Sequence, residues 1–201
     1  DVRKQVDVIY LDIAKAFDRV NHCLLLAKLE SFGFSVSLLK FFKSYLSNRQ
    51  VNVTINGFAS TSYCQLSGIP QGSNLGPLLF QLFINDLPDI FSEVCCLLFA
   101  DDVKLYKKIN TVDDCLVLQY NVHNALSWCK LNELGINSNK CKVMSYTRNI
   151  NKINFDYSLL SSDIMSVSAI ADLGIIFDSQ MSFNEHIKYV TAMLNKLLGL
   201  I

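Results

Sequence analysis

Two adjacent aspartates, Asp101 and Asp102, follow an apolar run that is typical of a β-strand. We expect Val94–Phe99 to form a strand buried on both faces and Val103–Tyr106 to form its hairpin partner, which leaves the two aspartates in the tight turn between them. Neighbouring carboxylates raise each other's pKa, and a divalent cation would relieve this repulsion. Ordinary turn-forming aspartates are the simpler interpretation of the pair taken alone.

A third carboxylate, Asp12, follows a second strand-like run, VDVIYL, at residues 6–11. Two strands that each end in an acidic residue can lie side by side and gather their carboxylates at one edge of a sheet. Such a cluster is what two-metal phosphoryl chemistry requires, because one ion activates the attacking hydroxyl and the other stabilises the leaving phosphate. The three aspartates are therefore the first candidates for a catalytic metal site.

The remaining pattern predicts an α+β fold, a small antiparallel sheet backed by helices. Helices are expected at residues 20–33, 37–46, 77–85, 111–130 and 183–201. Further strands are expected at 142–146, in short pieces across 153–177, and in a hairpin of 51–55 with 62–66 that turns at Asn56-Gly57. Near residue 150 the sequence pattern changes to short strand pieces broken by turns. This change predicts a larger unit at 1–150 and a smaller one at 151–201.

Composition limits the class of protein. The chain has 201 residues, 51% of them hydrophobic, and a formal net charge of zero from 18 basic and 18 acidic residues. Its apolar runs are too short for a membrane span, so we predict no membrane partner, and neutrality argues against a large phosphate-binding surface within these residues. A chain that begins with Asp rather than Met is expected to be a fragment of a longer protein.

Cysteines and lysines give weaker signals. Seven scattered cysteines without a CxxC pair indicate buried, reduced thiols in an intracellular protein rather than zinc ligands or disulfides. Two groups of basic residues are expected to be solvated surface, with a phosphate-facing stripe as the alternative. They are Lys104, Lys107 and Lys108, and Lys140, Lys142, Arg148 and Lys152.

Four sequence motifs, in this order along the chain, resemble the palm of reverse transcriptases. In detail they are similar to the motifs of non-LTR (LINE-type) retrotransposons. They are YLDIAKAFDRVNH (10–22), SGIPQGSNLGPLLF (67–80), LLFADDVKLY (97–106) and LNELGINSNKCKVMSY (131–146). A fifth, ADLGIIFDSQMSFNEHI (171–187), is similar to the segment that follows the palm in those elements. The resemblance implies that 1–150 is a palm whose fingers are missing and that 151–201 leads towards the thumb.

The resemblance also implies a metal site. Asp12 and Asp101 match the aspartates that bind the two catalytic metals, and Asp102 matches a supporting carboxylate. Ile13 would offer its backbone carbonyl to a metal. The implied cofactor is a pair of Mg²⁺ ions, for which Mn²⁺ can substitute. Asp18, in the same string, is expected to be a helix N-terminal residue favoured by the helix dipole and not a ligand.

Four further residues match positions that contact the nucleotide. Phe17 would pack under the sugar and exclude a 2′-hydroxyl, Gln71 and Gly72 would form a loop against the incoming nucleotide, and Lys140 would neutralise the departing pyrophosphate. Each also has a plainer interpretation. Phe17 could be core packing, Gln71-Gly72 a simple turn into a helix, and Lys140 an exposed loop lysine.

The implied reaction is template-directed transfer of dNTPs to a primer 3′-hydroxyl by an RNA-directed DNA polymerase. Its partners would be an RNA template, a DNA primer, dNTPs, and the fingers and thumb of the parent polyprotein. We expect little activity from the fragment alone and an intracellular, nuclear site of action, although the chain carries no targeting signal. Two alternatives stay open: an inactive or repurposed remnant that at most binds nucleic acid, and an RNA-templated RNA polymerase, against which Phe17 counts.

Overall fold

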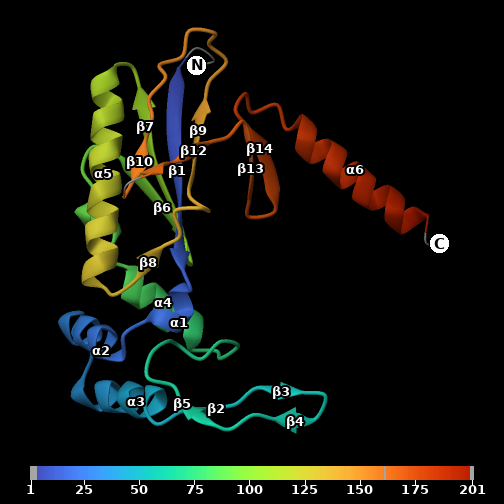
Figure 1. The fold of residues 1–201 in the computed structure, drawn as a ribbon. Helices are drawn as coiled ribbons and strands as arrows, with labels where there is room; N and C mark the ends of the chain where they lie inside the picture. The colour runs from blue at the N-terminus through green and yellow to red at the C-terminus, as the bar shows by residue number, and fades with distance from the viewer. Residues whose placement is uncertain (1–3, 161, 200–201) are drawn as a thin grey trace.

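A mixed sheet built on one long central strand organises the computed structural model, which describes residues 4–160 and 162–199 (Figure 1). The central strand is β1 (Gln5–Ala14), with β7 (Asp102–Ile109) and β9 (Lys142–Tyr146) antiparallel on its two sides. Beyond them lie β6 (Cys95–Phe99), antiparallel to β7, and the two-residue β12 (Met165–Ser166), parallel to β9. The predicted α+β class, with a small sheet backed by helices, is confirmed.

One face of the sheet forms the core. Along β1 every second side chain is buried, including Ile9, Leu11 and Ile13, and these belong to one apolar cluster with side chains of the helices α4 (Gly76–Ile84) and α5 (Val112–Leu131). The alternate residues of the strand, such as Tyr10 and Asp12, are only half-buried and lie on the other face. The pleat of β1 therefore directs Asp12 away from the helices.

Three helices precede the turn-rich middle of the chain: α1 (Ala16–Arg19), α2 (His22–Ser31) and α3 (Val36–Leu46). A two-part hairpin follows, in which β2 (Gln50–Val51) pairs with β5 (Tyr63–Cys64) and β3 (Thr54–Ile55) pairs with β4 (Phe58–Ala59). The predicted turn at Asn56-Gly57 is confirmed, since both residues have positive φ, 50° and 83°. This hairpin projects away from the helices (Figure 1).

The last quarter of the chain begins by packing onto the sheet and its helices. The short strands β10 (Ser158–Leu159) and β11 (Ser162–Asp163) pair with each other, and the Tyr157 hydroxyl, buried beneath them, donates to Asp7 of β1 at 2.7 Å. A second hairpin, β13 (Ala169–Asp172) with β14 (Ile175–Asp178), leads to α6 (Asn184–Leu198), none of whose described residues is buried. The boundary near residue 150 stays a prediction.

A short 3-10 helix (Pro88–Ile90) and β8 (Gly135–Ile136) complete the elements. Within residues 4–160 and 162–199, no helix is both long and apolar enough to cross a lipid bilayer.

Three details of the predicted strands are wrong. Strand β6 is not buried on both faces: it is the edge strand of the sheet, and Cys95, Leu97 and Phe99 are exposed. Asp102 is the first residue of β7 rather than a turn residue. Strand β1 continues past Asp12 to Ala14, since its last two residues pair with β8.

The cysteine prediction is only partly correct. All seven thiols are free, and Cys115, Cys129 and Cys141 are buried. Burial raises the pKa of the Cys129 thiol to about 12, which keeps it protonated at neutral pH. By contrast Cys23, Cys64 and Cys95 are exposed, because they lie on an outer helix face, on the projecting hairpin and on the edge strand.

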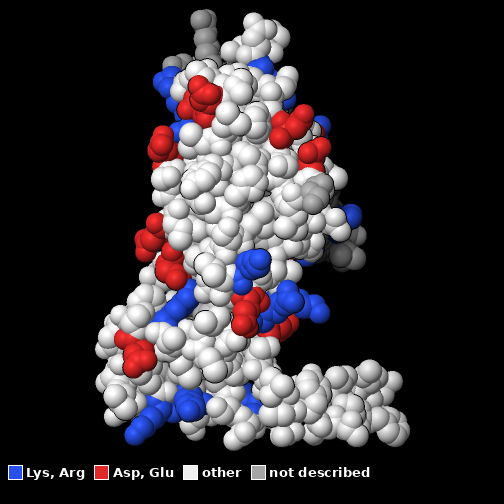
Figure 2. Space-filling model, turned by 60° about the vertical axis from the view of Figure 1, so that its left-hand side comes forward, with Lys and Arg blue, Asp and Glu red and all other residues white. Residues whose placement is uncertain are grey.

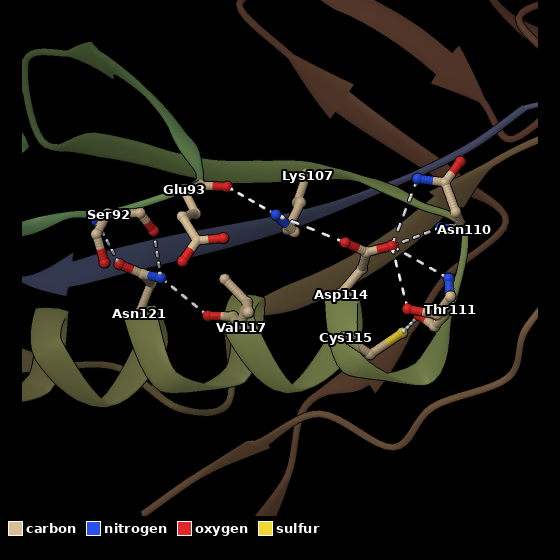
Figure 3. A network of polar contacts seen from close by, with 9 residues as sticks. All are labelled: Ser92, Glu93, Lys107, Asn110, Thr111, Asp114, Cys115, Val117 and Asn121. Atoms are coloured by element: carbon tan, nitrogen blue, oxygen red, sulfur yellow. Dashed lines mark hydrogen bonds and ion pairs between the residues drawn. The ribbon is translucent and has the colours of Figure 1, made fainter.

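A polar network fixes the β6–β7 hairpin to α5 (Figure 3). The buried Asn121 side chain accepts the backbone N–H of Ser92 and donates to its carbonyl, just before β6. Lys107 of β7 donates to the carbonyl of Glu93 and lies 3.6 Å from a carboxylate oxygen of Asp114 in the first turn of α5. Lys107 is therefore a structural residue, and the prediction that it is solvated surface is wrong.

Replacing Asp114 with alanine should destabilise the chain by about 1 kcal/mol at pH 7, because Asp114 accepts the N–H groups of Asn110 and Thr111 that precede the helix. The hydrogen bond from Asn110, with that from Thr111 and the charge of Lys107, lowers the pKa of Asp114. The stabilisation is therefore complete above the unfolded value near 3.9 and is lost as pH falls through the lower folded pKa.

Urea unfolding at pH 7 and at pH 3 measures this effect, and the difference between wild type and variant should shrink at pH 3. The matched control is the exposed Asp113→Ala, in the same helix turn, for which we expect less than about 0.5 kcal/mol. Equal losses for the two variants at pH 7 would contradict the capping role.

Candidate active site

Strand pairing brings two of the three predicted metal ligands together. Asp12 of β1 and Asp102 of β7 are direct partners in the antiparallel register, so their side chains leave the same face of the sheet with Cβ atoms about 5 Å apart. Both line one cavity of about 350 Å³. The other ionisable residues that line it are Tyr10, Lys104, Lys140, Lys142 and Asp172. The sequence prediction of a shared carboxylate edge is thus realised for this pair.

Asp101 lies one residue outside this arrangement. It is half-buried in the turn between β6 and β7, after Ala100 with its φ of 52°, and it is not among the residues that line the cavity. In the part of the chain that the structure describes, no group of three or more His, Cys, Asp or Glu residues is placed to hold a metal ion. The structure therefore joins Asp12 to Asp102 and leaves the role of Asp101 a prediction.

The carboxylates in and next to the cavity repel one another. Loss of solvent around Asp102, together with the negative charges of Asp101, Asp172 and Asp12, raises its pKa, and the Lys104 ammonium only partly offsets this. Lys140 Nζ lies 3.7 Å from Asp12 Oδ1, but the lysine side chain is 67% exposed, so this ion pair is weak. Carboxylate oxygens are the ligands that a hard divalent cation prefers, and Asp12 and Asp102 bring such oxygens to this cavity.

Asp12 is held in place through its backbone. Its carbonyl accepts the N–H of Asn137 at 2.9 Å, and its own N–H donates to the Cys141 sulfur at 3.5 Å. The same loop carries Lys140 to the cavity. The Ile13 side chain is buried on the helix side of the sheet, so only its backbone is available for the predicted role.

Of the predicted nucleotide-contacting residues, Lys140 lines the cavity, whereas Phe17, Gln71 and Gly72 do not. Phe17 is half-buried and stacks on Phe80 with ring centroids 4.4 Å apart. The loop that carries Gln71 and Gly72 is joined to α1 by backbone hydrogen bonds, among them Ile69 N–H to Phe17 O at 2.8 Å. Gln71 lines a separate hollow of about 680 Å³.

Sequence reasoning missed two partnerships. Asp18 is in the first turn of α1, as predicted, but its carboxylate also accepts a 2.8 Å hydrogen bond from the Gln71 side chain. Lys104, predicted to be solvated, is paired with Asp172 of β13 instead. The only sequence signal for Asp172 is its position in the fifth family-like string.

Surface charge does not mark a nucleic-acid footprint on the face drawn in Figure 2, where acidic and basic side chains are interspersed. The projecting hairpin region, residues 50–66, contains no charged residue at all and forms the uncharged arm at the lower right of that view. This agrees with the neutral composition.

Comparison with known proteins identifies the family to which this chain belongs. The family described as "Reverse transcriptase (RNA-dependent DNA polymerase)" matches residues 2–193. The RNA-directed DNA polymerase from mobile element jockey of Drosophila funebris is 32% identical over 189 residues, which are 89% of this chain and 20% of that protein. A Pol polyprotein from the type-1 retrotransposable element R2 of Popillia japonica is 24% identical over 71% of this chain and 25% of its own length.

The chain thus spans only about a fifth of the length of the first curated relatives that it matches. Among solved structures, apo telomerase from Candida tropicalis superposes with a TM-score of 0.60 at 12% identity, covering 90% of this chain and 35% of that one. A telomerase from Candida albicans superposes with a TM-score of 0.55 at 14% identity, over 88% and 32% of the two chains. These likenesses support the palm-like fold.

Proposed function

Since this chain belongs to the reverse transcriptase family of non-LTR retrotransposons, we propose that its parent protein is an RNA-directed DNA polymerase and that residues 1–150 form its palm. Residues 151–201 would lead from the palm towards the thumb. The observation that carries the proposal is the direct pairing of Asp12 with Asp102 above one cavity at the end of the sheet. The fingers and thumb, elsewhere in the parent polyprotein, would complete the substrate-binding site.

Reverse transcriptases generally use divalent metals, and Asp12 and Asp102 bring to the cavity the carboxylate oxygens that such ions prefer. We propose Asp12 and Asp101 as the ligands of two Mg²⁺ ions, for which Mn²⁺ can substitute, with the Ile13 carbonyl as a further donor and Asp102 as a supporting carboxylate. Bound there, the ions would lower the pKa of the primer hydroxyl and neutralise charge on the phosphates. Asp101 would have to turn towards the cavity to take part.

The protein groups would act by position and charge. The paired strands hold Asp12 and Asp102 in register, so that the primer 3′-hydroxyl and the α-phosphate of a dNTP can meet beside them. Lys140, already 3.7 Å from Asp12, would neutralise the departing pyrophosphate. Gln71 and Gly72 would contact the incoming nucleotide, and the RNA template and DNA primer would lie across the open face. We place this reaction in the nucleus.

Primer extension by the full-length parent tests the proposal. A DNA primer on an RNA template should be extended with dNTPs in Mg²⁺ and not in excess EDTA. The absence of extension under all metal conditions would favour the alternative of an inactive or repurposed remnant, and a preference for rNTPs would favour an RNA polymerase. Residues 1–201 alone should extend poorly, and robust extension by them would contradict the need for the parts outside this chain.

Phe17 provides a second measurement in the same assay. If its ring excludes the 2′-hydroxyl, Phe17→Ala should raise incorporation of rNTPs relative to dNTPs by roughly tenfold to a hundredfold. Phe17→Leu, which keeps more of the packing on Phe80, should change the ratio less. An unchanged ratio in Phe17→Ala would assign Phe17 to core packing.

A further inference from the structure

An ion pair joins the catalytic strand β7 to the β13–β14 hairpin. Lys104 Nζ lies 2.5 Å from Asp172 Oδ2, and the two side chains are only 13% and 15% exposed. The ammonium also lies 5.9 Å from the centre of the Tyr10 ring, on the central strand. A pair this enclosed is screened far less by water and salt than a surface pair. Its loss should therefore change the positions of both β7 and the β13–β14 hairpin.

The pair is located at the carboxylate cavity. Lys104 is two residues beyond Asp102 on the same face of β7, and Asp172 is the last residue of β13, just before the turn at Leu173-Gly174. Asp172 and Leu173 line the cavity together with Asp12 and Asp102. The ion pair therefore connects the tip of the hairpin to the sheet beside Asp12 and Asp102.

The rest of the hairpin is attached at its other end. Ser179, just after β14, donates its N–H to Ser168 O and accepts the N–H of Thr147, both at 2.9 Å. Between this base and the tip lies a space of about 330 Å³, lined mostly by apolar and aromatic side chains of the sheet and by Phe177 and Met181. With this space under its middle, the hairpin meets the sheet near its tip through the Lys104–Asp172 contact.

We propose that the Lys104–Asp172 ion pair is a positioning clamp, which fixes the tip of the β13–β14 hairpin beside Asp12 and Asp102. The clamp also directs the Lys104 ammonium towards Asp172, so that it does not compete with a metal for Asp102, its neighbour on β7. Lys104 and Asp172 are positioning residues and not catalytic ones. The consequence for catalysis rests on the proposed polymerase function, whereas the clamp itself does not.

Amide hydrogen exchange of the full-length parent tests the clamp without relying on activity. Asp172→Asn and Lys104→Met should each accelerate exchange at least tenfold across residues 169–178, and the double variant should resemble the single ones, because either change already breaks the pair. The matched control is Lys108→Met, an exposed lysine on the same strand, which should leave this region unchanged. Exchange within twofold of wild type in both single variants would overturn the clamp.

Primer extension then tests its role in the reaction. Misplacing groups around a reaction centre by about 1 Å costs up to a hundredfold in rate, so each single variant should lower kcat tenfold to a hundredfold while KM for dNTP stays within about twofold. Lys104→Arg, which keeps the charge, should recover most of kcat. Faster exchange with unchanged kcat would overturn the positioning role, and a parent that extends no primer would refute the proposed function while the exchange result still decides the clamp.

Discussion

Replacing Asp12 with asparagine in the full-length parent should lower the rate of primer extension by at least about a thousandfold. Asparagine preserves the shape of the side chain and the pairing of β1 with β7, but it removes the negative charge that a divalent ion needs opposite Asp102. Asp101→Ala should cause a comparable loss if Asp101 completes the metal site. Single-turnover extension at saturating Mg²⁺ measures both effects.

The matched control is Asp163→Asn, an exposed carboxylate on β11 in a different part of the fold. It should extend at the wild-type rate, and circular dichroism should show all three variants folded. Equal extension by wild type and Asp101→Ala would refute a metal role for that residue and leave the pair of Asp12 and Asp102 as the whole carboxylate site.

Replacing Gly68 with alanine should lower the free energy of unfolding by about 2–4 kcal/mol. Gly68 has a φ of +88°, and an added Cβ would lie 2.6 Å from the backbone oxygen of Asp18, so the loop or α1 must move. Gly33 is the matched control, since its φ is +84° but nothing lies within 4 Å of an added Cβ. Gly33→Ala should therefore cost only the backbone strain, about 1 kcal/mol.

Urea denaturation of both glycine variants separates the cost of backbone strain, which both variants have, from the cost of the steric clash with Asp18, which only Gly68→Ala has. Because the same loop carries Gln71, Gly68→Ala should also raise KM for dNTP in the full-length parent, whereas Gly33→Ala should not. Equal destabilisation by the two substitutions would show that the contact between the loop and α1 is not tight.

Local patterns predicted the elements well. The bounds of β9 match the prediction, α5 begins and ends within one residue of the predicted helix, and Asn56-Gly57 forms its turn, because strand alternation, helical periodicity and turn residues act over a few neighbours. That Asp12 and Asp102 share one face of the sheet could likewise be predicted, because two strand-like runs each lead to an acidic residue. The exposure of β6 could not be predicted, because a strand's place in a sheet is a tertiary property.

Non-local partners account for the rest of what was missed. Lys104 and Asp172 are 68 residues apart, and Gln71 and Asp18 are 53 apart, so no local pattern links them. A lysine beside acidic residues resembles solvated surface until its distant partner is known. The family resemblance assigned a role to Gln71 but gave no indication that its side chain would bond Asp18.

The register between β1 and β7 makes the number of residues in these strands as important as their identity. Inserting or deleting one residue between Gln5 and Asp12 would turn Asp12 to the helix side of the sheet and put an apolar neighbour in its place opposite Asp102. The uncharged hairpin at residues 50–66 has no such constraint, because its tip is exposed and far from the paired strands. Changes of chain length during divergence should therefore accumulate in that hairpin and be eliminated from β1.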